Sequence, residues 1–73
     1  MNPLIQHLLV TTQPQFTPRG NVVNGVRYSY YIGEHGPFFD DFVKGEDTVA
    51  AVQAAMQANI EKLAAVGAIP PQV

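Results

Sequence analysis

The sequence contains no cysteine and few charged residues. Without cysteine, neither a disulfide nor a thiolate-ligated metal cluster can stabilise the chain. Charged residues make up 14% of the 73 residues, against roughly 25% in an average globular domain, whereas 47% are hydrophobic. A chain this short buries only about 60% of the surface that its unfolded form exposes. The sequence therefore predicts one small domain that gains stability by self-association or by docking into a larger body.

Basic residues are also scarce, and this scarcity bears on several classes of function. The net charge is −2, and the four basic residues are scattered, at Arg19, Arg27, Lys44 and Lys62. Because phosphate contacts require clustered Lys and Arg, direct nucleic-acid binding is not expected. The N-terminus lacks the basic region of a signal peptide, and no apolar run approaches the ~20 residues of a membrane span. We expect a soluble protein made in the cytoplasm, with no membrane partner.

The first 20 residues have no single clear pattern. Residues 2–12 fit a helix by the spacing of their leucines, but they also fit a strand, because residues 8–12 end in β-branched side chains. We favour an extended N-terminal arm, followed by a Pro-rich linker that ends at Gly20. The predicted organisation is an arm and linker at 1–20, a hairpin and helix body at 21–67, and a tail at 68–73.

The strongest local signal in the body is Asn24-Gly25, which lies between β-branched residues. Asn-Gly favours a two-residue type I′ hairpin, because both turn positions need a positive φ. Direct pairing across this turn would place Val23 opposite Val26 and Asn21 opposite Tyr28.

The outgoing strand of this predicted hairpin and one further strand follow the turn. Residues 26–32 alternate cleanly, with Arg27, Ser29 and Tyr31 on the face opposite to Val26, Tyr28, Tyr30 and Ile32. Residues 33–37 predict a second turn. Residues 38–43 predict a third strand, placed at a sheet edge because neither of its faces is purely apolar.

A helix is predicted from Thr48 to Val66, with Asp47 or Thr48 as N-cap and Gly67 as the C′ residue. Its apolar stripe recurs at three- and four-residue steps and consists of Val49, Val52, Met56, Ile60 and Leu63. The predicted fold class is α+β: a small antiparallel β-meander of two to three strands packed against one C-terminal α-helix, with an extended N-terminal arm. Tyr28, Tyr30, Ile32 and the phenylalanines of the meander are expected to cover the stripe.

The rest of the helix surface is unusually rich in alanine. Seven alanines lie between Thr48 and Val66, and Glu61 and Lys62 are the only charges there. Alanine is the best helix former, so these residues could simply stabilise an exposed helix. We favour burial against a partner, because an exposed helix face normally carries Glu and Lys. The predicted contact residues on this face are Ala51, Ala54, Ala55 and Ala58.

A second candidate interface lies on the predicted sheet. Arg27, Tyr31 and Phe39 are expected to face outward together, and aromatic and arginine residues are enriched in protein interfaces. Base stacking on the tyrosines is disfavoured, because no basic cluster accompanies them.

Candidate chemistry is limited to one segment. His35 follows Glu34 and precedes Asp40 and Asp41, which are residue types that bind metals or transfer protons. A tight turn separates neighbouring side chains, however, and the i, i+4 spacing of helical metal sites is missing. The one serine, Ser29, lacks the glycines of a nucleophile elbow. We therefore predict no catalytic residue, no metal ligand, no cofactor and no enzymatic activity.

These observations favour a non-enzymatic structural or assembly subunit that docks into a larger protein complex. Its partner is either another copy of the chain or a larger body, most concretely a phage-like virion into which the protein is incorporated as a small component. One alternative is a small soluble regulator that binds one protein partner. A second alternative is a metal-dependent enzyme centred on His35.

Overall fold

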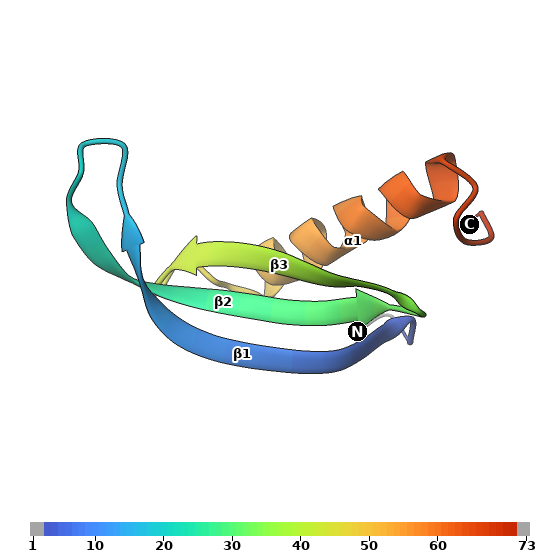
Figure 1. The fold of residues 1–73 in the computed structure, drawn as a ribbon, viewed down its shortest axis with the longest axis horizontal. Helices are drawn as coiled ribbons and strands as arrows, with labels where there is room; N and C mark the ends of the chain where they lie inside the picture. Colours follow the sequence, from blue (N-terminus) through green and yellow to red (C-terminus); the bar gives the residue numbers. More distant parts are fainter. Residues whose placement is uncertain (1–2, 72–73) are drawn as a thin grey trace.

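The computed structural model describes residues 3–71, which form a three-stranded sheet followed by one helix (Figure 1). The strands are β1 (Ile5–Phe16), β2 (Val22–Ile32) and β3 (His35–Val43), and the helix is α1 (Val49–Ala65). The strands are antiparallel and lie in the order β1-β2-β3, so the sheet is a simple meander. The predicted α+β meander with a C-terminal helix is confirmed.

The N-terminal segment is extended, but it is a strand of the sheet and not an arm. β1 pairs with β2 from Ile5 opposite Ile32 to Phe16 opposite Val22, so the strand alternative is the correct one from Ile5 onward. The pairing is irregular between Gln6 and Leu9, where His7 has a φ of 55°.

The predicted hairpin at Asn24-Gly25 is wrong. Both residues lie within β2, where Asn24 pairs with Pro14 and Gly25 pairs with Gln13, and Gly25 also pairs with Val43 of β3. The connection between β1 and β2 instead spans residues 17–21, where the Thr17 N–H donates to the Asn21 carbonyl at 2.8 Å. Turn propensity at Asn-Gly is therefore overridden by pairing of β2 on both sides.

The second turn is shorter than predicted. Ile32 pairs with His35, so Gly33 and Glu34 alone form the loop and β3 begins at His35. Gly33 has a φ of 59°, a conformation that glycine adopts without steric cost at the first position of a two-residue hairpin loop.

The helix begins and ends where its capping residues predict. The Thr48 hydroxyl oxygen accepts a hydrogen bond from the Ala51 N–H at 3.2 Å, which identifies Thr48 as the N-cap. At the other end Gly67 has a φ of 77°, and the Ala68 N–H donates to the Leu63 carbonyl at 2.9 Å. This bond is the long-range bond of a Schellman motif. No helix within residues 3–71 is both long and apolar enough to cross a lipid bilayer.

The core lies between the sheet and the helix. Its buried residues are Tyr30, Ile32, Met56, Ile60 and Ile69, and its half-buried residues include Tyr28, Phe38, Val52 and Leu63. The predicted contact of Tyr28, Tyr30, Ile32 and Phe38 with Val52, Met56, Ile60 and Leu63 is confirmed. Val49 is the exception, because it is exposed at the start of the helix. Ile69 was not predicted, and it brings the segment after the helix back into the core.

Candidate protein-docking surface

The sheet has one face that the helix does not cover, here called the outer sheet face. Tyr30 and Ile32 point from β2 into the core, so Arg27, Ser29 and Tyr31 point to the opposite side by strand alternation. Residues that pair across strands share a face, which adds three rows from β1 and β3. These rows are Leu9–Ser29–Phe39, Thr11–Arg27–Asp41 and Gln13–Gly25–Val43.

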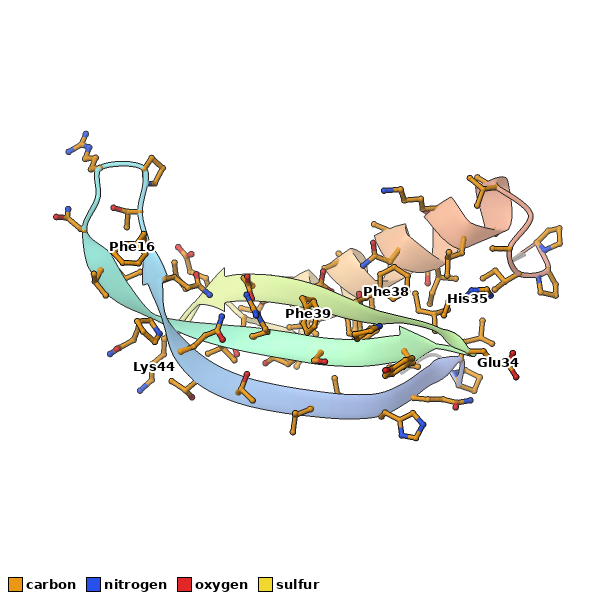
Figure 2. All side chains as sticks on the ribbon, in the orientation of Figure 1. Phe16, Glu34, His35, Phe38, Phe39 and Lys44 are labelled. Atoms are coloured by element: carbon orange, nitrogen blue, oxygen red, sulfur yellow. The ribbon has the colours of Figure 1, made fainter. Side chains whose placement is uncertain are left out.

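Large apolar side chains are exposed on the outer sheet face. Leu9 on β1 is 58% exposed, Phe39 on β3 is 55% exposed and Val43 is 38% exposed. Ser29 lies between Leu9 and Phe39, and its small side chain leaves both of them accessible. In Figure 2, Phe38 lies beside α1 and its neighbour Phe39 lies over the sheet. The outer sheet face therefore presents apolar groups from both edge strands, which is a feature of surfaces that contact other proteins.

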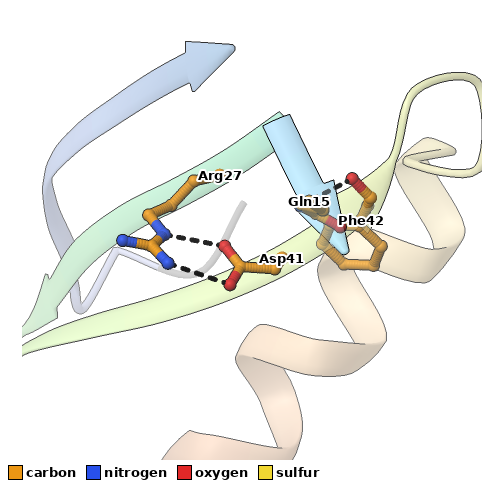
Figure 3. A network of polar contacts seen from close by, with 4 residues as sticks. All are labelled: Gln15, Arg27, Asp41 and Phe42. Carbon is orange, nitrogen blue, oxygen red and sulfur yellow. Dashed lines mark hydrogen bonds and ion pairs between the residues drawn. The ribbon is translucent and has the colours of Figure 1, made fainter. Parts of the chain in front are cut away.

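Arg27 is held in one orientation on this face. Its Nε and Nη2 donate to the two carboxylate oxygens of Asp41 at 2.7 and 3.1 Å (Figure 3). Its guanidinium carbon lies 5.1 Å from the centre of the Phe39 ring, at cation–π distance. The hydrogen bonds raise the pKa of Arg27 and lower the pKa of Asp41. Arg27 and Phe39, which alternation places on one face, are thus in contact with each other.

Tyr31 lies on the same face but makes a different contact. Its ring meets the His7 ring edge to face, with the centroids 5.6 Å apart, at the irregular part of β1. Tyr31 therefore lies at the end of the sheet near the β2–β3 turn. The structure pairs Arg27 with Phe39 and places Tyr31 further along β2.

The alanine face lies on the other layer of the molecule. Ala54 and Ala58 are exposed on α1, whereas Ala51 and Ala55 are half-buried. The two sets of predicted interface residues are therefore separated by the core. A single flat partner surface cannot contact both of them at once.

A polar group that the sequence analysis did not predict links the two layers. The Tyr30 side chain is fully buried, and its hydroxyl donates to Asp40 Oδ2 at 2.5 Å. The same oxygen accepts a hydrogen bond from Asn59 Nδ2 of α1 at 2.6 Å. Burial first, and then the bond to Asp40, raise the pKa of Tyr30. One feature of the sequence indicates this buried polar group: Asp40 is a carboxylate that shares a strand face with two phenylalanines.

A shallow hollow of about 170 Å³ lies between the start of α1 and the sheet, lined mainly by Leu8, Tyr28, Val49, Val52 and Met56. At its rim the Tyr28 hydroxyl donates to Asp47 Oδ2 at 2.7 Å. This bond lowers the pKa of Asp47 and raises the pKa of Tyr28. Because α1 lies beside β3, the hollow opens towards β1, where Leu8 lines it (Figure 1).

The candidate chemistry around His35 is not assembled. His35 Nε2 lies 3.2 Å from the Ala68 carbonyl, while Asp40 contacts Tyr30 and Asp41 contacts Arg27. Alternation along β3 puts the two aspartates on opposite faces of the sheet. Within residues 3–71, no group of three His, Cys, Asp or Glu side chains is placed to hold a metal ion.

In comparisons with known proteins, no protein-family model matches the chain, and no curated protein or solved structure matches it.

Proposed function

We propose that the protein is a non-enzymatic assembly subunit that docks into a larger protein complex through its outer sheet face. The observation that carries this proposal is the exposure of Leu9, Phe39 and Val43 on a face that α1, the one helix within residues 3–71, does not cover. Burial of such side chains yields about 25 cal/mol per Å² of apolar surface, so a matching partner surface gains stability by covering them.

Arg27 supports the same proposal. The carboxylate of Asp41 fixes its guanidinium beside Phe39, so little side-chain entropy remains to be lost on binding. A fixed arginine next to an exposed aromatic ring is a common composition for the centre of an interface. The partner surface it fits is apolar at its centre, with polar acceptors around it.

The most concrete form of the proposal is a small component of a virus particle, made in the cytoplasm and then incorporated. This step rests on analogy with the small size and the uncovered surfaces of such subunits, and fold alone does not imply function. The alternative is a regulator that binds one protein partner transiently.

Sedimentation of native extracts tests the proposal. We expect the untagged chain to co-sediment with a large particle in a fixed molar ratio, and the Phe39→Ser variant to remain in the light fractions. Gln57→Ala, a change at an exposed position of α1 outside both candidate surfaces, is the matched control and should behave like the wild type.

Ala54→Glu provides a second arm, because it places a charge on the alanine face. Loss of co-sedimentation with Ala54→Glu, and retention with Phe39→Ser, would overturn docking through the outer sheet face in favour of the helix. A wild-type chain found only in a one-to-one complex with a single protein would favour the regulator.

A further inference from the structure

The free edge of β1 carries no charged side chain that would prevent another strand from pairing with it. β1 is an outer strand of the sheet, and its twelve residues include no Asp, Glu, Lys or Arg (Figure 1). The opposite edge strand, β3, carries Asp40 and Asp41. Natural sheets usually protect an exposed edge with charges, prolines or bulges, because unpaired main-chain groups bind other strands.

The orientation of the main chain shows which groups of β1 are available at this edge. The Lys44 N–H donates to the Asn24 carbonyl at 3.0 Å, so the main-chain groups of Asn24 point towards β3. Pro14 pairs with Asn24, and its main chain therefore points away from β2. By the two-residue alternation of an antiparallel ladder, the N–H and C=O groups of Val10 and Thr12 also point outward.

Two irregular features limit the part of β1 that can pair. The register shift near Leu8 interrupts the ladder at one end, and Pro14 lacks an N–H at the other. Leu8 and Pro14 lie three residues before and three residues after Thr11. The open stretch is therefore symmetric about Thr11.

We propose that β1 pairs antiparallel with β1 of a second copy of this chain, about a two-fold axis at Thr11. Val10 then exchanges both main-chain hydrogen bonds with Thr12 of the partner subunit, and the reverse pair forms by symmetry. The same register places Leu8 opposite the partner's Pro14. The proline, which has no N–H to donate, then lies opposite the part of β1 where the ladder is already interrupted. A strand of different sequence would not share this symmetry, which is why the second copy is the occupant.

This pairing also covers exposed apolar side chains on both faces of the sheet. Leu9 on the outer sheet face is 58% exposed, and Val10 on the helix side is 50% exposed. The two three-stranded sheets join into one continuous sheet. The inference does not depend on the proposed docking function, because edge pairing uses the main chain of β1, whereas docking uses the side chains around Phe39.

Cysteine cross-linking tests the register directly, since the 73-residue chain has no other cysteine. Thr11 would face its symmetry mate in a non-hydrogen-bonded pair, with the two Cα atoms about 4.5 Å apart, within the range of a disulfide. Thr11→Cys should therefore oxidise to a covalent dimer of twice the 7.9 kDa chain mass. In the matched control Leu9→Cys, the two Cα atoms would lie roughly 13 Å apart, and no dimer should form. Equal cross-linking of both variants, or of neither, overturns the proposed pairing.

Light scattering on the untagged chain, from micromolar to millimolar concentration, provides a second measurement. The wild type should become dimeric as the concentration rises. Thr12→Pro removes an outward N–H without breaking a bond to β2, and it should raise the dissociation constant at least about tenfold. Phe39→Ser should remain dimeric, which separates edge pairing from docking through the outer sheet face. A wild type that stays monomeric, or a dimer that is lost with Phe39→Ser and kept with Thr12→Pro, overturns the proposal.

Discussion

The side chain of Gln15 lies directly over Gly25, so close that a Cβ at position 25 would be 2.3 Å from its Cδ atom. Gln15 uses this space to cross β2 and donate from Nε2 to the Phe42 carbonyl on β3 at 3.1 Å (Figure 3). One side chain thus links both edge strands across the central strand. Glycine is required at position 25 for this close approach, not for a turn.

This relationship predicts that Gly25→Ala destabilises the protein. The added methyl group displaces the Gln15 side chain and breaks its hydrogen bond to Phe42, so we expect the free energy of unfolding to fall by about 1 kcal/mol. Urea unfolding monitored by circular dichroism measures this change. In a Gln15→Ala background the same substitution should cost nothing, because the position above residue 25 is then empty. Equal costs in both backgrounds would contradict the proposed crowding.

Tyr30→Phe should weaken the link between the sheet and the helix. The substitution removes the hydroxyl that bonds both Asp40 and Asn59 in the core, so we expect a loss of about 1–3 kcal/mol in the free energy of unfolding. Tyr31→Phe is the matched control, because the Tyr31 hydroxyl has no hydrogen-bond partner within residues 3–71. It should change stability by less than about 0.5 kcal/mol. Similar losses for the two variants would show that the buried bonds of Tyr30 contribute little.

Stability should also fall in alkaline solution, because the Tyr30 hydroxyl is buried and hydrogen-bonded in the folded state. Burial and the bond to Asp40 raise the pKa of Tyr30 above its ordinary value of 10.0. Above about pH 10 the unfolded chain therefore loses a proton that the folded chain keeps, and the Tyr30 contribution to stability declines by up to about 1.4 kcal/mol per pH unit. Urea unfolding at increasing pH should show the stability gap between wild type and Tyr30→Phe narrowing in this range. A constant gap would indicate that Tyr30 ionises equally in both states.

The local features of the helix could be predicted from the sequence because they depend on neighbours in the chain. Thr48 and Gly67 cap α1 as their residue types predict, and the stripe from Val52 to Leu63 meets the sheet. On β2, strict alternation was enough to place Arg27 on the outer sheet face. The shared face of Arg27 and Phe39 followed from the same alternation on β3.

The errors arise where distant residues decide the structure. Asn24-Gly25 has the composition of a turn, but it is a strand because β2 pairs with β1 and β3 there, and Gln15 crosses over Gly25. Residues 5–16 carry no strong periodic pattern, because α1 covers little of β1. Their structure is decided by pairing with β2, a segment further along the chain. Asn59 lies in the alanine-rich helix with no local pattern that indicates its role, and its amide completes the buried bonds of Tyr30.

Metal addition tests the alternative of an enzyme centred on His35. His35 Nε2 contacts the Ala68 carbonyl at 3.2 Å, and the nearby aspartates are bonded to Tyr30 and Arg27. We therefore expect Zn²⁺ to leave thermal unfolding unchanged. His35→Ala should lower the free energy of unfolding by about 0.5–1 kcal/mol, because the tail loses one hydrogen bond to β3, and the loss should be the same with and without Zn²⁺. A metal that binds the folded state raises stability with its concentration, by about 2.7 kcal/mol at a hundredfold excess over its dissociation constant. A stabilisation of that kind in the wild type, absent from His35→Ala, would instead favour a metal site at this position.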